Sequence, residues 1–121
     1  MPKAICIRRS EAKSLAFGEL QIWDYEPGRD LSSSLALVQV KPGAAHGRAR
    51  SIRCDKYYYA LNGLVEFQLG EIEYWLGQGD LLIVPKGEWF DYRNGGNETA
   101  TLLLMHTPPF TMDGEEFAGE E

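Results

Sequence analysis

The residues in this sequence that could transfer a proton are few. There are two histidines, His46 and His106, and one lysine, Lys56, that precedes three consecutive tyrosines. Histidine titrates near neutral pH and is therefore a common general acid or base. A desolvated lysine can lose its proton and act as a base or as a Schiff-base nucleophile. An acid–base mechanism in this chain must use a histidine, Lys56, a carboxylate or a tyrosine.

The elements that must position these residues are short strands. Runs of β-branched and aromatic residues are separated by Gly, Pro, Asn and Asp, which is typical of strands and turns. Asn62-Gly63 predicts a tight hairpin. Helical periodicity is limited to one turn at 10–15, and nine short strands indicate an all-β barrel. The expected strands are 4–7, 20–25, 35–41, 56–61, 64–70, 72–76, 81–84, 89–93 and 99–107.

Length and composition narrow the class of protein. The chain has 121 residues and a hydrophobic fraction of 44%, which predicts a single domain, 1–121, with one core. Its net charge of −6 and the lack of a basic stretch argue against nucleic-acid binding. No segment has the length of a membrane span or signal peptide, so we expect no membrane association and a cytoplasmic location. The acidic tail, 113–121, is expected to be frayed.

Two segments carry glycine, proline and asparagine at fixed spacings. The first runs Gly43, five residues, Ala49-Arg50-Ser51, four residues, Lys56, six residues, Gly63. The second runs Gly79, five residues, Pro85-Lys86-Gly87, two residues, Phe90, three residues, Asn94. These segments resemble the paired motifs of the cupin superfamily, and the resemblance covers about 35–110. It implies a small single-domain cupin, a double-stranded β-helix (jelly-roll) barrel. A fold alone does not supply a function.

The departure from the family pattern concerns the metal ligands. In the family, two histidines, a glutamate and a third histidine bind the metal; here those positions hold Ala49, Ser51, Lys56 and Phe90. Alanine and phenylalanine have no donor atom, serine is a poor ligand, and a protonated lysine repels a cation. Neither Cys6 nor Cys54 belongs to a metal-type cysteine pair or a disulfide framework. We therefore expect no metal and no cofactor.

Strand alternation in the implied barrel predicts what lines its mouth. Residues with the parity of the family's ligands are Lys56, Tyr58 and Ala60 on one strand, and Phe90 and Tyr92 on another. Such a pocket would suit a small organic ligand with a planar or apolar body and an anionic or carbonyl group. The candidate catalytic residues are Lys56, Tyr58 and His46. The candidate ligand-binding residues are Tyr92, Phe90, Ser51 and His106.

Each polar candidate also has a structural interpretation. The Lys56 side chain could extend to the rim, hold an anionic ligand, or pair with a carboxylate, for which Glu66, Glu88 and Asp91 are candidates. By simple alternation His46 faces away from the pocket, although Gly47 could bend the strand. His106, at the end of an apolar strand, could be a hydrogen-bonded structural group. Both interpretations stay open for all three residues.

The three consecutive tyrosines must face both sides of a sheet. Tyr58 then points inward, and Tyr57 and Tyr59 cover the outer face, to which Trp75 would add an aromatic ring. A large exposed aromatic patch is typical of an interface. The sequence therefore predicts a homodimer, with packing under an N-terminal strand as the alternative.

Three classes of function follow from these residues. The first is a metal-independent isomerase, epimerase, cyclase or lyase that acts on a sugar-like or polyketide-like molecule. The second is a non-catalytic module that binds a small molecule, and the third is a structural or partner-binding barrel. An enzyme needs an open pocket with titratable groups within hydrogen-bond reach, whereas a structural barrel needs a filled interior.

Overall fold

A computed structural model of the chain describes residues 4–26 and 31–119. The described residues form antiparallel strands and two short 3-10 turns, Arg9–Glu11 (η1) and Met112–Gly114 (η2). The strands are β1 (Lys13–Phe17), β2 (Leu20–Asp24), β3 (Ser34–Val40), β4 (Ala49–Ser51), β5 (Asp55–Asn62), β6 (Leu64–Leu69), β7 (Ile72–Gly77), β8 (Leu81–Val84), β9 (Asp91–Arg93), β10 (Ala100–Thr107) and β11 (Glu115–Phe117). None of the described helices could span a membrane.

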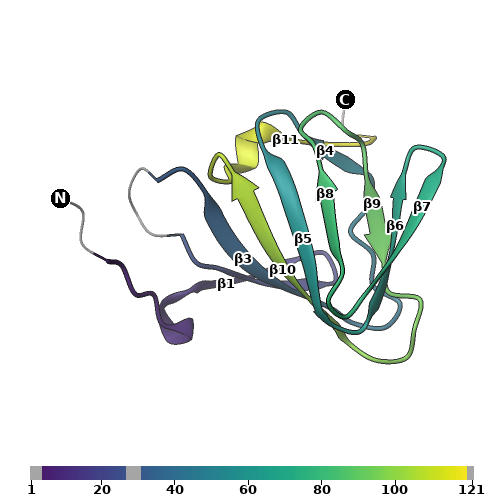
Figure 1. The fold of residues 1–121 in the computed structure, drawn as a ribbon, viewed down its shortest axis with the longest axis horizontal. Helices are drawn as coiled ribbons and strands as arrows, with labels where there is room; N and C mark the ends of the chain where they lie inside the picture. The colour runs from purple at the N-terminus through teal and green to yellow at the C-terminus, as the bar shows by residue number, and fades with distance from the viewer. Residues whose placement is uncertain (1–3, 27–30, 120–121) are drawn as a thin grey trace.

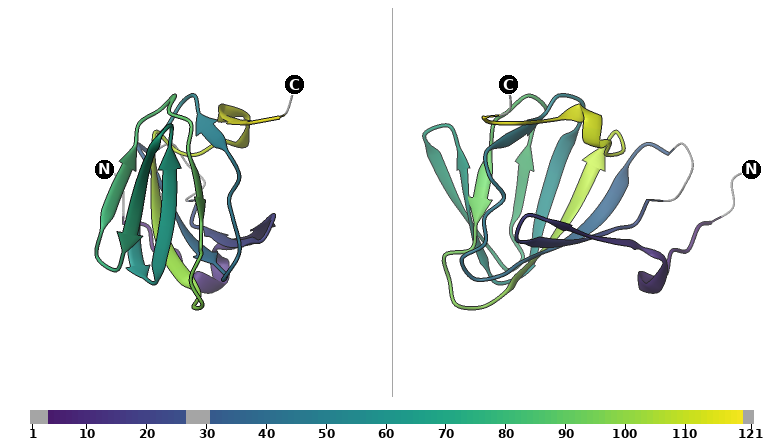
Figure 2. Two further views of the ribbon diagram at one scale, coloured as in Figure 1. Left: turned by 90° about the vertical axis from the view of Figure 1, so that its right-hand side faces the viewer. Right: turned by 180° about the vertical axis from the view of Figure 1, so that it is seen from behind.

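Three sheets enclose the core. The largest has the strand order β1-β2-β3-β10-β5-β8, a three-stranded sheet has the order β7-β6-β9, and β11 pairs with β4. Figure 1 shows the large sheet and the β7-β6-β9 sheet leaning toward each other, with β4 and β11 across one end. The views in Figure 2 show the β1–β2 hairpin at the edge of the large sheet, across its lower part, with β4 and β11 above it. The result is a barrel-like fold with one end framed by β11.

The inner face of the large sheet is built from cross-strand rows of side chains. One row contains Ala36, Leu104 and Tyr58, and the next contains Ser34, His106 and Lys56. Further along the strands, Val38, Leu102 and Ala60 continue the core and are fully buried. Polar residues of the inner face are therefore collected at the end of the barrel that β11 frames.

The strands expected from 20 to 107 are confirmed, but the chain before them differs from the prediction. Residues 4–7 form no strand, and 10–15 contain the end of η1 and the start of β1 instead of a helical turn. Gly18, at φ 58°, turns the chain so that β1 pairs with β2. This hairpin occupies the edge of the sheet that an earlier strand would have needed.

The C-terminal segment also differs from the expected frayed tail. Residues 115–117 form β11, which pairs with β4 in the register Glu115↔Ser51, Glu116↔Arg50 and Phe117↔Ala49. Charge complementarity supports the pairing, because Arg50 Nε lies 2.6 Å from Glu116 Oε1. The alternation within β11 turns Glu115 and Phe117 inward and Glu116 outward. Residues 120–121 of the tail lie outside the described residues.

The motif residues act as the resemblance implies. Gly63 has φ 83°, and a Cβ there would lie 2.6 Å from Ala100 Cα, so only glycine fits this turn. The buried Asn94 side chain donates to the carbonyls of Val40 and Glu98 and accepts a bond from the Gly96 N–H. These contacts fix the loop that leads into β10.

Candidate functional site

A pocket opens at the β11 end of the fold, between the inner face of the large sheet, the β1–β2 hairpin and the C-terminal segment. Its volume is about 80 Å³, enough for several water molecules. Its polar lining is contributed by Asp24, Ser34, His46, Lys56, Tyr58, Tyr92, His106 and Glu115. The apolar lining includes Phe17, Ala36, Leu104, Phe110, Met112 and Phe117. The interior next to Lys56 is therefore hollow, unlike that of a purely structural barrel.

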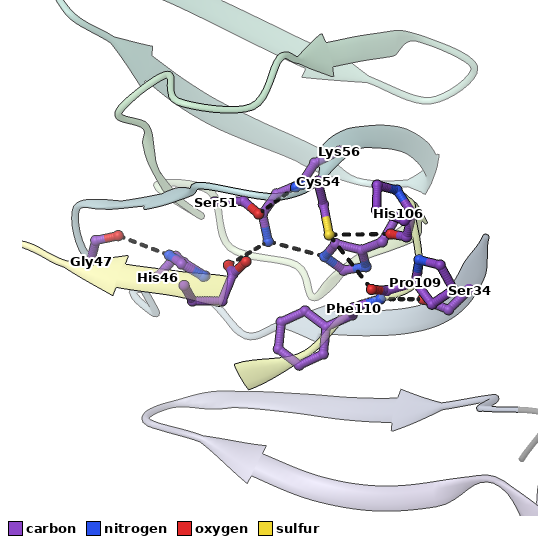
Figure 3. A network of polar contacts seen from close by, with 11 residues as sticks. Ser34, His46, Gly47, Ser51, Cys54, Lys56, His106, Pro109 and Phe110 are labelled. Carbon is purple, nitrogen blue, oxygen red and sulfur yellow. Dashed lines mark hydrogen bonds and ion pairs between the residues drawn. The ribbon is translucent and has the colours of Figure 1, made fainter. Parts of the chain in front are cut away.

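Lys56 forms the central polar contact of the pocket. Its Nζ lies 2.7 Å from Glu115 Oε1, and the two side chains are 4% and 3% exposed. The same Nζ lies 3.0 Å from His106 Nε2, and Figure 3 shows the lysine reaching toward this ring. The predicted partners Glu66, Glu88 and Asp91 do not fill this role. Glu66 instead pairs with Arg93, and Asp91 accepts a bond from the Gly47 N–H.

The contact with Lys56 fixes the protonation of His106. An ammonium group only donates hydrogen bonds, so Nε2 must be the acceptor and the ring must be neutral, with its proton on Nδ1. Burial, and then the charge of Lys56, lower the pKa of His106 to about 3. Its ring packs against Phe110 at 4.9 Å between centroids. His106, as a neutral hydrogen-bond acceptor, therefore positions the Lys56 ammonium group.

His46 lies in the pocket because Gly47 interrupts strand alternation. Gly47 has φ 92°, a conformation that glycine adopts easily, and it turns the chain between His46 and β4. The imidazole Nδ1 lies 2.8 Å from the Gly47 carbonyl oxygen (Figure 3). Since a carbonyl only accepts, Nδ1 carries the proton and Nε2 has the free lone pair. Burial is the main cause that lowers the pKa of His46, which keeps this ring neutral.

Two buried polar atoms in the site have no hydrogen-bond partner among the described residues. They are the hydroxyl of Tyr58 and Oε2 of Glu115. Burial, then the charges of Tyr92 and Glu115, and last a weak interaction of its hydroxyl with that of Tyr92 raise the pKa of Tyr58 well above its usual value, so the phenol stays protonated. This contact with Tyr92 falls short of a hydrogen bond with normal geometry. Burial likewise raises the pKa of Tyr92, whose ring lies 5.5 Å from that of Tyr58. An unmade hydrogen bond is costly in a buried site, and a bound ligand could supply both.

Residues 36–106 match the family described as Cupin domain, which is more than half of the chain. This chain belongs to the cupin family. No curated protein matches the cupin significantly in sequence, but many solved structures share its fold.

Three of these structural neighbours are different kinds of protein with the same fold. Streptomyces PAC13, described as a unique nucleoside dehydratase, has a TM-score of 0.81 and 21% identity over 96% of this cupin and 92% of that chain. KdgF from Halomonas has a TM-score of 0.77 and 15% identity, covering 93% and 98%. The cupin domain of Schizosaccharomyces pombe Cnp3 has a TM-score of 0.71 and 18% identity, covering 82% and 70%. At these identities the likeness establishes the cupin β-barrel fold.

The four positions that hold the metal in other cupins do not fit a metal ion here. Ala49 and Phe90 are fully buried and bridge each other through their backbones. Ser51 Oγ accepts the backbone N–H of Cys54, and Lys56 is held by Glu115. The ring of Phe90 packs at a tilt against His46, with 5.1 Å between centroids, and its centroid lies 5.6 Å from Lys56 Nζ, so an apolar ring stands where the family has a histidine. Among the described residues, no three His, Cys, Asp or Glu side chains form a group that could hold a metal.

The structure brings five of the seven predicted site residues together. His46, Lys56, Tyr58, Tyr92 and His106 line the pocket of this cupin. The other two do not line it. Phe90 lies behind the His46 ring, and Ser51 bonds to the backbone of the next loop.

Sequence reasoning missed two carboxylates, Glu115 and Asp24, that line the pocket. The alternation of Glu115, Glu116 and Phe117 was the available signal for an inward glutamate. Among the roles left open for Lys56, the structure favours pairing with a carboxylate, and that carboxylate is Glu115.

Proposed function

We propose that this cupin is a metal-independent lyase or isomerase that moves a proton on a small, uncharged, hydroxylated carbonyl compound. The observation that carries the proposal is a pair of buried atoms, Tyr58 Oη and Glu115 Oε2, that make no hydrogen bond of normal geometry, in a pocket with neutral His46. A donor and an acceptor of this kind suit a carbonyl or hydroxyl ligand. The pairing of Lys56 with Glu115 leaves no excess positive charge, which favours an uncharged ligand.

The residues support a defined division of roles. Nε2 of His46 takes a proton from a carbon next to the ligand's carbonyl, and the electron pair moves toward the carbonyl oxygen. Tyr58 donates a hydrogen bond to that oxygen, where negative charge develops. Glu115 Oε2 accepts a hydrogen bond from a ligand hydroxyl and orients it. The protonated His46 then returns its proton to a departing hydroxyl, which gives water and a double bond, or to the substrate, which gives an isomer.

The structural neighbours support this class of chemistry. PAC13 is described as a nucleoside dehydratase, and solved forms of it with uridine include single replacements of one histidine and of two tyrosines. The pocket of this cupin also contains two tyrosines, Tyr58 and Tyr92, and a histidine that is not bonded to the lysine, His46. Loss of water from a hydroxylated carbonyl compound requires the same acid–base steps without a metal.

The experiment is hydrogen–deuterium exchange at carbon. The protein in D₂O is mixed with a panel of hydroxylated aldehydes and ketones, and proton NMR follows exchange and loss of water. The wild type should exchange the proton next to the carbonyl of at least one compound. His46→Gln and Tyr58→Phe should each lower that rate by about 100-fold or more. Tyr57→Phe, a neighbour on the outer face, is the matched control and should keep the rate.

Two results would count against catalysis. If no compound exchanges, or if His46→Gln exchanges at the wild-type rate, the proton-transfer proposal is wrong. Binding of a compound without exchange would instead support the alternative, a module that only binds a small molecule.

We also propose a homodimer that forms through the outer face of the large sheet. Tyr57 and Tyr59 lie opposite Ile83 and Leu81 of the edge strand β8, and Tyr59 and Leu81 are 40% and 55% exposed. This apolar face is suited to an identical copy because a two-fold contact pairs it with itself. Tyr59→Glu should give a monomer in analytical ultracentrifugation if the wild type is a dimer. We further propose a cytoplasmic location and no nucleic-acid or membrane partner. These expectations rest on the net negative charge and on the lack of a segment with the length of a membrane span or signal peptide.

A further inference from the structure

The pocket extends across four strands of the large sheet. Asp24, Ala36, Leu104 and Tyr58 lie directly opposite one another on β2, β3, β10 and β5, and all four line the pocket. Adjacent strands are about 4.8 Å apart, so three spacings separate Asp24 from Tyr58 by roughly 14 Å along the backbone. The groups that would react lie at the Tyr58 end, and Asp24 lies at the other.

The middle of this row is apolar. Ala36, with its small side chain, and Leu104 form the floor there. Aromatic rings also line the pocket, and among them Phe17 lies 5.4 Å from Phe117 and 5.2 Å from the His46 ring. Figure 3 shows the Phe110 ring on the side of the Lys56 network that faces the β1–β2 hairpin. Aromatic walls over an apolar floor fit a flat ring, since stacked rings gain from contact between their faces.

Asp24 gives the far end of the row a different chemistry. Its carboxylate is partly buried, and Lys13 lies directly opposite it on β1 and is the nearby positive charge that acts on it. Burial is the main cause that raises its pKa, with a contribution from Glu26, and the charge of Lys13 opposes this rise without cancelling it. A carboxylate in such a position accepts hydrogen bonds from N–H or O–H donors that a ligand presents.

We infer that the ligand has two joined parts: a hydroxylated ring at Tyr58 and Glu115, and a flat heterocycle whose ring N–H is held by Asp24. The position of the reacting end rests on the proposed function, whereas the position of the heterocycle rests on the row from Tyr58 to Asp24. Asp24 then acts as a specificity-determining residue. A molecule with a single ring leaves one end of the row without contacts.

Calorimetric titration with four probes tests the inference. Uridine and inosine combine a hydroxylated ring with a flat heterocycle that carries a ring N–H, 3-methyluridine lacks that N–H, and methyl riboside lacks the heterocycle. Wild-type protein should bind uridine or inosine at least about tenfold more tightly than methyl riboside. It should also bind uridine about tenfold more tightly than 3-methyluridine, because a charge-assisted hydrogen bond is lost.

The variant Asp24→Ala assigns this preference to one residue. It should bind uridine about tenfold more weakly than the wild type and should bind 3-methyluridine and methyl riboside unchanged. Asp113→Asn, at a carboxylate whose side chain is 88% exposed, is the control and should behave as the wild type. Circular dichroism confirms that each variant is folded.

Several results overturn the inference. These are nucleosides that bind no more tightly than methyl riboside, equal binding of uridine and 3-methyluridine, or an Asp24→Ala variant that retains the preference. If one of these results is found while hydrogen–deuterium exchange at carbon still depends on His46, the two-part ligand is wrong and the proposed proton transfer stands. If nucleoside selectivity depends on Asp24 but no compound exchanges its proton, the proposed chemistry is wrong and the two-part ligand stands.

Discussion

Removing one partner of the buried Lys56–Glu115 pair should strongly destabilise the fold. Glu115→Gln keeps the size of the side chain and removes its charge, which leaves the Lys56 ammonium without a counter-charge. The two side chains are 4% and 3% exposed, and the ion pair spans 2.7 Å. Breaking a buried pair from one side costs about 3–5 kcal/mol of unfolding free energy, because one charge stays desolvated and unpaired.

The adjacent residue offers a matched control for this variant. Glu116 pairs with Arg50 at 2.6 Å, but these side chains are 45% and 35% exposed. The two pairs share a strand and nearly the same separation, so they differ mainly in burial. Glu116→Gln should therefore cost no more than about 1 kcal/mol. The double variant Lys56→Met/Glu115→Gln should recover most of the loss, since it removes both buried charges.

Urea unfolding followed by tryptophan fluorescence measures these differences. A cost of about 3–5 kcal/mol should lower the melting temperature of a domain of this size by roughly 10–20 °C. If Glu115→Gln and Glu116→Gln differ by less than about 1 kcal/mol, burial does not set the strength of the pair. A double variant less stable than either single variant would also refute the reasoning.

Three further predictions concern protons, a turn and metals. The free energy of unfolding should fall as the pH drops from 6.5 toward 3, by up to about 1.4 kcal/mol per pH unit. In this range His106 binds a proton in the unfolded chain but not in the folded one, where its pKa is about 3. In urea titrations between pH 6.5 and 5, His106→Gln should flatten that slope, and an unchanged slope would contradict the assignment. Gly63→Ala should lower the free energy of unfolding by more than about 2 kcal/mol, because the Ala100 backbone is too close for a Cβ. Gly70 also has a positive φ but open space around it, so Gly70→Ala should cost about 1 kcal/mol. Equal costs for the two variants would show that the contact with Ala100 is unimportant. Dialysis against a chelator should leave the melting temperature and any carbon exchange unchanged, and loss of either would indicate a bound metal.

The sequence predicts eight of the eleven described strands, all but β1, β4 and β11, and part of the pocket, because both depend on local patterns. Alternation from the family's ligand positions places Lys56, Tyr58 and Tyr92 correctly on the inner face. The same rule assigns His46 to the outside and fails there, because Gly47 takes a positive φ and the alternation does not continue through it. A glycine shows that a strand can bend, but not in which direction.

The missing members of the site are those whose position depends on distant segments. The partner of Lys56 is Glu115, 59 positions away along the chain, in a tail whose composition is typical of disorder. The tail is ordered by its pairing with β4, and its charges alone do not reveal that pairing. Asp24 likewise enters the pocket through the β1–β2 hairpin, whose first strand the sequence pattern did not indicate.

The pocket takes its walls from strands spread between β1 and β11, so no contiguous part of the chain contains it. A compound that fits it binds the folded chain and not the unfolded one, and each tenfold excess over its dissociation constant adds about 1.4 kcal/mol to the unfolding free energy. Melting temperature is thus a sensor for the natural ligand. A metabolite library screened by thermal shift, with Asp24→Ala and Tyr58→Phe as counter-screens, would distinguish compounds held at either end from those bound elsewhere.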